Sequence, residues 1–137
     1  MIRGLVSDRH AQAIAWVAVF LPALLIVLGL VLDGGLAFTT RRDLQNLADG
    51  AARAGAMQVD QVAYTTNGTL QLDPGQAQTA AQVYLSAHPD VAARVTVGPT
   101  WVTVTVTESQ PTVFLKLFGI SAVTMSAHAT ANARIGQ

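Results

Sequence analysis

The sequence predicts an α+β protein. We expect a long amino-terminal transmembrane helix that extends into a small extracytoplasmic domain, where helices cover an antiparallel sheet of three or more strands. Three observations predict this class. Residues 13–32 carry no charge, the following segment keeps a helical spacing of small apolar residues, and from about residue 94 apolar residues alternate with threonine.

The composition of the chain excludes several classes of partner and of chemical site. Charged residues make up 12% of the 137 residues, against roughly 25% in a typical soluble domain, and hydrophobic residues make up 51%. The net charge is zero, which argues against bulk attraction to nucleic acid, so we expect no nucleic-acid partner. The absence of cysteine excludes disulfides, thiolate metal sites and cysteine nucleophiles.

The uncharged segment is interpreted as a membrane anchor. Twenty helical residues, Ala13–Leu32, span roughly 30 Å, which matches the hydrocarbon core of a bilayer. A buried core helix is the alternative, but so short a chain could hardly cover it on every side. A cleaved secretory signal would have an apolar region of about 7–15 residues and a small-residue cleavage site. Gly35-Leu36-Ala37 fits such a cleavage site poorly, which favours an anchor over a cleaved signal. Separately, Pro22 predicts a kink within the span.

The orientation of the anchor is predicted mainly from segment size. Arg3 and Arg9 lie in a leader of residues 1–12, and Arg41 and Arg42 follow the span, so counting cations gives nearly a tie. The short leader and the large polar remainder favour a cytoplasmic amino terminus. We therefore expect a single-pass protein of the cytoplasmic membrane, in contact with lipid, whose carboxyl-terminal domain is extracytoplasmic.

A helical extension is predicted over residues 33–62. It forms either one helix with the span or a collinear piece jointed at Gly34-Gly35. Small residues recur along it at a spacing of four, which permits close helix packing: Ala48, Ala52 and Ala56, and also Ala51 and Gly55. Two alternatives stay open for this stripe: it packs on the sheet of its own domain, or it contacts another subunit.

Residues 63–137 are predicted to form the small α+β domain. Residues 64–72 read as a loop with a turn at Asn67-Gly68 and a short strand over 69–72. Asp73 and Pro74 are typical of an N-cap and a first helical position, so a helix is expected to run to about Ala87.

Period-two patterns predict the sheet. Val95–Val106 reads as a hairpin that turns at Gly98-Pro99, with one valine face and one threonine face. A short apolar helix over 111–118, closed by Gly119, is expected to cap the sheet. Ser121–Ala133 is the last predicted strand, with Ala127 and its alternating neighbours on the apolar face.

No catalytic constellation is apparent. His10, His88 and His128 lack a partner at the three- or four-residue spacing typical of a metal pair, and the acidic residues are scattered singly. Serines such as Ser109 have no nucleophile-elbow sequence around them. We therefore expect no enzyme activity, no metal and no cofactor.

One segment resembles a known family. After the anchor, an Asp-x-Gly exit, an Arg-x-x-Leu-Gln stretch and an Asp-x-Ala-Ala run follow in order. The chain is thereby similar to the TadE/TadG-like proteins of the tight-adherence (Flp) pilus assembly system, over roughly residues 10–57. The matching positions are Asp33, Gly35, Arg41, Leu44, Gln45, Asp49, Ala51 and Ala52.

The resemblance implies a structural role in pilus assembly. The partners would be pilus or secretion-assembly proteins, a second copy of the chain or a TadE/TadF-like protein, and the length suggests a TadE-sized pseudopilin. Pilin-like members are often trimmed after a glycine, with a glutamate five residues into the mature chain. Here the glycine is Gly4 and the fifth residue beyond it is Arg9, so we predict that processing is absent and Met1 or its neighbour is retained.

Two functional hypotheses follow. The first is a membrane-anchored minor pilin or pseudopilin that acts through helix packing and stays in the membrane or enters a surface filament. The second is a membrane-anchored binding module for a ligand or envelope component, which would use a threonine-rich face: Thr103, Thr105, Thr107, Thr124 and Thr130.

Overall fold

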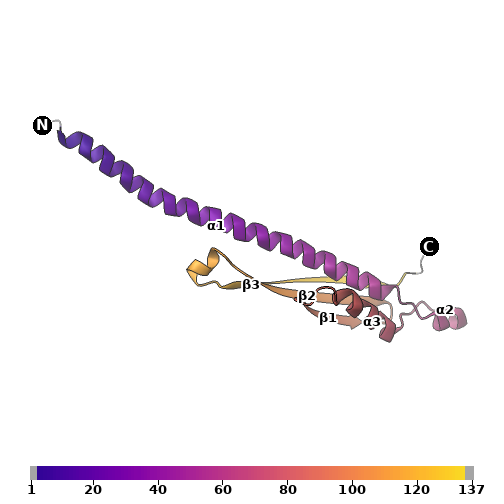
Figure 1. Ribbon diagram of the computed structural model, residues 1–137. Helices are drawn as coiled ribbons and strands as arrows, with labels where there is room; N and C mark the ends of the chain where they lie inside the picture. Colours follow the sequence, from indigo (N-terminus) through magenta and orange to yellow (C-terminus); the bar gives the residue numbers. More distant parts are fainter. Residues whose placement is uncertain (1–2, 135–137) are drawn as a thin grey trace. The chain divides into compact units, whose positions relative to one another are not determined.

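A computed structural model describes residues 3–134 (Figure 1). Side chains are described from His10 onward. The prediction that Met1 or its neighbour is retained concerns residues outside this range. The side chains of Arg3 and Arg9 also lie outside the described part. The elements, in chain order, are α1 (Arg3–Ala56), α2 (Gln61–Asn67), α3 (Pro74–Leu85), β1 (Ala92–Val97), β2 (Trp101–Pro111), the 3-10 helix η1 (Leu115–Phe118) and β3 (Ala122–Asn132). The predicted α+β class, with a long apolar amino-terminal helix and a three-stranded antiparallel sheet, is confirmed.

The chain forms two compact units. The anchor unit comprises the residues up to Leu36 together with Pro111–Ala122, which is the connection between β2 and β3. The sheet unit comprises Ala37–Gln110 and the residues from Val123 onward. Helix α1 contributes to both units.

The span and the helical extension form one helix, which was one of the two predicted alternatives; the other was a joint at Gly34-Gly35. Helix α1 passes through Pro22 and through Gly34-Gly35 without a break in the helical assignment. It ends at Ala56, earlier than residue 62, because the chain then forms an isolated bridge between Val59 and Leu72. The short strand expected over 69–72 is reduced to this bridge.

Helix α2 occupies part of the predicted loop. Asp60 caps it by accepting hydrogen bonds from the amides of Val62 and Ala63, both at 3.0 Å. Gly68 ends it in the left-handed region at φ 65°, so the Asn67-Gly68 turn signal marked a helix end. The helix has no buried residue, and hence no apolar stripe from which it could have been predicted.

The sheet unit is a two-layer packing of helices on one sheet face. The strand order is β1-β2-β3, and β1 pairs antiparallel with β2 in a register that sets Val95 opposite Val104. Gly55 of α1 lies against both Ala77 of α3 and Val102 of β2, so the two helices share the valine face. The core lies between them: Leu44, Leu47, Ala48, Ala51, Ala52, Ala56, Leu72, Ala77, Ala81, Leu85, Val102, Val104, Val106, Ala127 and Ala129.

The expectation that segment 111–118 caps the sheet is wrong. Its helical part is the four-residue η1, which has no buried residue, and Leu117 is 81% exposed. The valine face is already covered by α1 and α3, since Val102, Val104 and Val106 are fully buried. The segment belongs instead to the anchor unit.

Substitution of Gly55 tests the close packing of α1 in the sheet unit. Alanine usually stabilises a helix over glycine by about 0.5–1 kcal/mol. At Gly55, however, the added Cβ would lie 2.9 Å from the Ala77 carbonyl oxygen and 3.2 Å from Val102. We expect Gly55→Ala to lower the thermal midpoint in detergent, measured by circular dichroism. Gly34→Ala, where a Cβ meets nothing within 4 Å, is the matched control; an equal or raised midpoint for Gly55→Ala would contradict this packing.

A pH dependence is predicted at the start of α3. The amide of Gln76, which donates to Asp73 at 3.0 Å, lowers the pKa of that carboxyl below its ordinary value of 3.8, with a further contribution from the Gln76 side chain. A lowered folded-state pKa means that the cap stabilises α3 fully above the unfolded-state pKa. Its contribution is lost as the pH falls through the folded-state value. The protection factor of the Gln76 amide, its exchange rate relative to the intrinsic rate at the same pH, should therefore fall on acidification more in wild type than in Asp73→Asn.

Candidate functional site: the anchor helix and its capped loop

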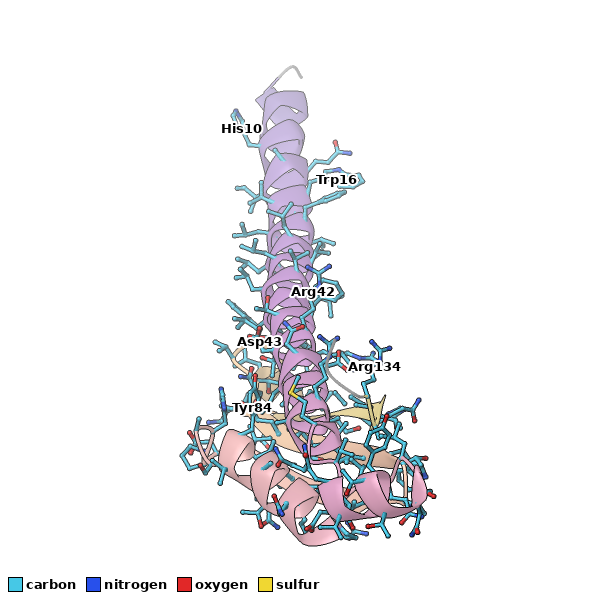
Figure 2. All side chains as sticks on the ribbon, turned by 90° about the vertical axis from the view of Figure 1, so that its right-hand side faces the viewer. His10, Trp16, Arg42, Asp43, Tyr84 and Arg134 are labelled. Atoms are coloured by element: carbon cyan, nitrogen blue, oxygen red, sulfur yellow. The ribbon has the colours of Figure 1, made fainter. Side chains whose placement is uncertain are left out.

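The anchor segment of α1 presents an apolar surface that its own chain leaves largely uncovered. Among the described residues, α1 is the one helix long and apolar enough to cross a membrane, and 6% of its most apolar window is buried. Leu24 is 67% exposed. Figure 2 shows side chains projecting around this part of the helix, with Trp16 labelled near its amino-terminal end. So long an apolar surface requires lipid or another protein to cover it.

Asp33 stands where the apolar run ends, and it is 8% exposed. Its carboxylate accepts three backbone hydrogen bonds from the β2–β3 connection. The Val113 amide donates to Oδ1 at 3.3 Å, and the amides of Phe114 and Leu115 donate to Oδ2 at 3.0 and 2.9 Å. These amides open η1, where Phe114 supplies no side-chain cap of its own. Asp33 therefore caps this short helix from a position about 80 residues earlier in the chain.

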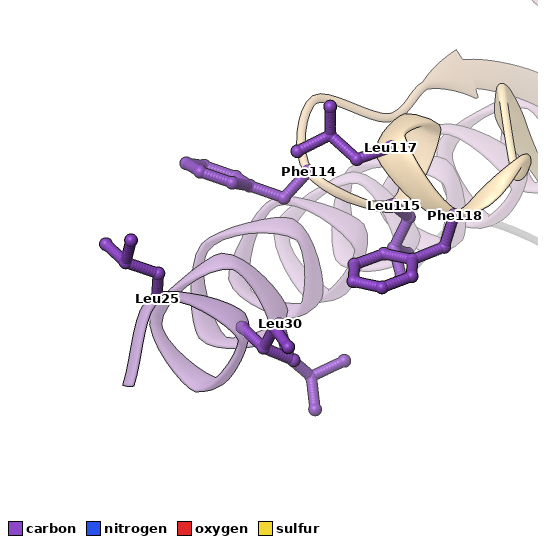
Figure 3. Close-up of a pocket in the computed structure, with 7 residues that line it drawn as sticks. Leu25, Leu30, Phe114, Leu115, Leu117 and Phe118 are labelled. Carbon is purple, nitrogen blue, oxygen red and sulfur yellow. The ribbon is translucent and has the colours of Figure 1, made fainter. Parts of the chain in front are cut away.

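The capped loop also packs directly on the anchor helix. A Cβ built on Gly29 would lie 2.7 Å from the Cβ of Phe114, so the missing side chain at Gly29 is what permits this approach. A groove of about 370 Å³ adjoins the contact (Figure 3). It is lined from α1 by Leu25, Ile26 and Leu30, and from the loop by Phe114, Leu115, Leu117 and Phe118. Every lining residue is apolar.

The residues of the predicted family motif differ in where they lie and what they contact. Leu44, Ala51 and Ala52 are buried in the core of the sheet unit. Gln45 donates from Nε2 to the carbonyl oxygen of His128 in β3 at 3.1 Å, and so ties α1 to the sheet. Asp33 caps the loop as described above.

The other three motif residues lie at the helix surface. Arg41 shares an open hollow with Phe38 and Arg42, and the Arg42 guanidinium lies 4.7 Å from the centre of the Phe38 ring. Asp49 is half-buried and lines a polar groove with Arg53. A Cβ at Gly35 would meet nothing within 4 Å.

The small-residue stripe is covered by its own domain. Ala48, Ala52 and Ala56 are all buried in the core of the sheet unit, and Gly55 touches α3 and β2. This is the intramolecular alternative of the two left open by the sequence. The stripe offers no exposed surface to a second subunit in this structure.

One polar groove of the sheet unit is lined by titratable residues that the sequence analysis did not place together. Asp43 of α1, His88 after α3 and Glu108 of β2 line one open depression of the sheet unit. They come from three separate segments, so no sequence spacing could have joined them. Among the described residues, no group of histidine, aspartate and glutamate side chains is placed to hold a metal ion.

Comparison with known proteins agrees with the anchor and motif. Residues 11–58 match the family model described as putative Flp pilus-assembly TadE/G-like, which confirms the resemblance over the anchor and the following helix. No curated protein and no solved structure gives a significant match.

Removal of the Asp33 carboxylate tests the cap. Hydrogen bonds to a charged group contribute about 1.5–3 kcal/mol. In Asp33→Ala we expect amide exchange across residues 113–115 to accelerate by about ten- to a hundred-fold. Hydrogen-exchange mass spectrometry in detergent measures this. Asp43→Ala, an exposed acidic position in the same helix, is the control. Unchanged exchange at 113–115 in Asp33→Ala would contradict the cap.

Proposed function

We propose that this TadE/G-like protein is a membrane-anchored, minor-pilin or pseudopilin-like component of a Tad (Flp) pilus or a related secretion assembly. The family match indicates involvement in Flp pilus assembly, and one apolar helix near the amino terminus fits a membrane anchor. The observation that carries the finer proposal is the uncovered apolar surface of α1. This surface runs along the part of α1 that belongs to the anchor unit, whereas the first core residue of the sheet unit along the chain is Leu44.

The role we propose for this surface is to hold the protein in the membrane and to contact neighbouring assembly proteins. The small-residue stripe is occupied within the chain, so intersubunit packing would use the apolar anchor face instead. Trp16 stacks on Phe20 with ring centres 5.2 Å apart, and the Phe38–Arg42 pair follows the span. Aromatic and cationic side chains near the two ends of a span are typical of membrane interfaces.

The sheet unit is proposed to lie outside the cytoplasm. The segment after the span carries a folded domain with polar helices and strands. Cation counts favour neither side strongly, so this folded domain is the main support.

The alternative of a ligand-binding module has weaker support. Its threonine face is half-exposed or exposed, as a binding face requires. However, the hydroxyls of Thr103 and Thr130 bond to each other at 2.7 Å, so these two groups partly satisfy one another across the strands. Threonine is also an ordinary residue for the solvent side of a sheet.

A deletion and complementation experiment tests the proposal. We expect cells that lack this protein to display fewer surface filaments, counted by electron microscopy, and the wild-type chain to restore them. Leu24→Asp should fail to restore them, because an aspartate near the centre of a span costs about 2.5–3.5 kcal/mol. Val83→Asp, on the exposed side of α3, is the matched control and should restore them. Unchanged filament numbers in the deletion strain would refute the proposal.

A further inference from the structure

We propose that the β2–β3 loop, residues 113–120, is a second membrane-contacting element that inserts beside the anchor helix into the outer leaflet. This inference rests on the proposed membrane anchoring of α1. The loop is joined to both neighbouring strands, so it would enter and leave on the same side. The molecules that this loop is proposed to contact are membrane lipids.

The first support is the depth at which the loop contacts the helix. Phe114 packs on Gly29, and the groove beside it reaches Leu25. Leu25 precedes the end of the apolar run at Leu32 by seven residues, or about 10 Å along a helix. Whatever surrounds the helix between Leu25 and Leu32 must therefore also surround the loop.

The second support is the surface of the loop. Its large apolar side chains point outward, not into a core of the unit: Val113, Leu117, Phe118 and Ile120 are all exposed. Of these four, Leu117 and Phe118 line the same groove as the apolar side chains of α1. Lys116 is the one charged side chain of the loop, and a lysine at this boundary can extend its ammonium group to the lipid headgroups.

The third support is backbone pairing. A non-helical segment can enter the apolar part of a membrane only if its polar backbone groups find partners. Asp33 accepts from the first three amides of the loop. The amides of Leu117, Gly119 and Ile120 donate to carbonyl oxygens of the loop itself, and Thr112 bonds through its amide to Ser121 and through its hydroxyl to Ile120. Six of the eight backbone amides of residues 113–120 are therefore paired within the anchor unit.

A depth measurement on the full-length chain tests the proposal. The sequence has no cysteine, so a single introduced cysteine can carry one nitroxide label. We would label Leu117→Cys on the loop, Val19→Cys on the span and Gln78→Cys on α3, all at exposed positions. Each variant is reconstituted in phosphatidylcholine–phosphatidylglycerol vesicles, with collisions to oxygen and to a water-soluble nickel chelate measured by electron paramagnetic resonance.

We expect the label at 117 to lose its accessibility to the nickel chelate and to gain oxygen collisions, as at 19, while the label at 78 stays accessible to nickel. Nickel accessibility at 117 equal to that at 78, with 19 shielded, would overturn the loop proposal and leave the anchor intact. Nickel accessibility at both 117 and 19 would overturn the anchor itself. Shielding at 117 from both reagents, with dipolar broadening between labels of neighbouring copies, would assign the loop to a protein contact and also overturn the proposal.

Discussion

The carboxylate of Asp33 is the interaction on which the anchor unit depends. Three amides at the start of the β2–β3 connection need acceptors, and an acidic side chain directly after an apolar run needs donors. Each group supplies what the other requires. Away from bulk water such hydrogen bonds are electrostatically stronger, and the penalty for leaving either partner unpaired is larger. Gly29 adds the close approach that lets Phe114 reach the helix backbone.

The contacts of the motif residues explain the motif in structural terms. Asp33 joins the helix to a loop, Gln45 joins it to a strand, and Leu44, Ala51 and Ala52 fill the core beneath it. Most of these residues thus attach one continuous helix to the rest of its own chain. Most of the exposed large apolar side chains lie in the span and in the loop beside it, and we propose that lipid or neighbouring assembly proteins contact them there.

Local signals in the sequence were sufficient for much of the fold. The uncharged run, the Asp73-Pro74 helix start and the valine–threonine alternation each depend on neighbouring residues, and the corresponding elements formed. Helix α2 was missed because it buries nothing and thus has no periodic apolar pattern. The apolar segment 111–118 was assigned to the sheet because hydrophobicity alone does not say which surface covers it. Its true contact depends on pairing between residues about 80 positions apart, which no local pattern encodes.

We expect the hydrogen bonds between Asp33 and the loop to persist in the membrane-embedded protein. Solid-state NMR on the chain in lipid bilayers can measure the dipolar coupling between a ¹³C-labelled Asp33 carboxyl carbon and the ¹⁵N-labelled Leu115 amide. We expect a measurable coupling, because the amide nitrogen lies 2.9 Å from Oδ2 and the labelled carbon is only one bond farther away. A coupling too weak to detect, in a sample whose α1 signals remain helical, would contradict it.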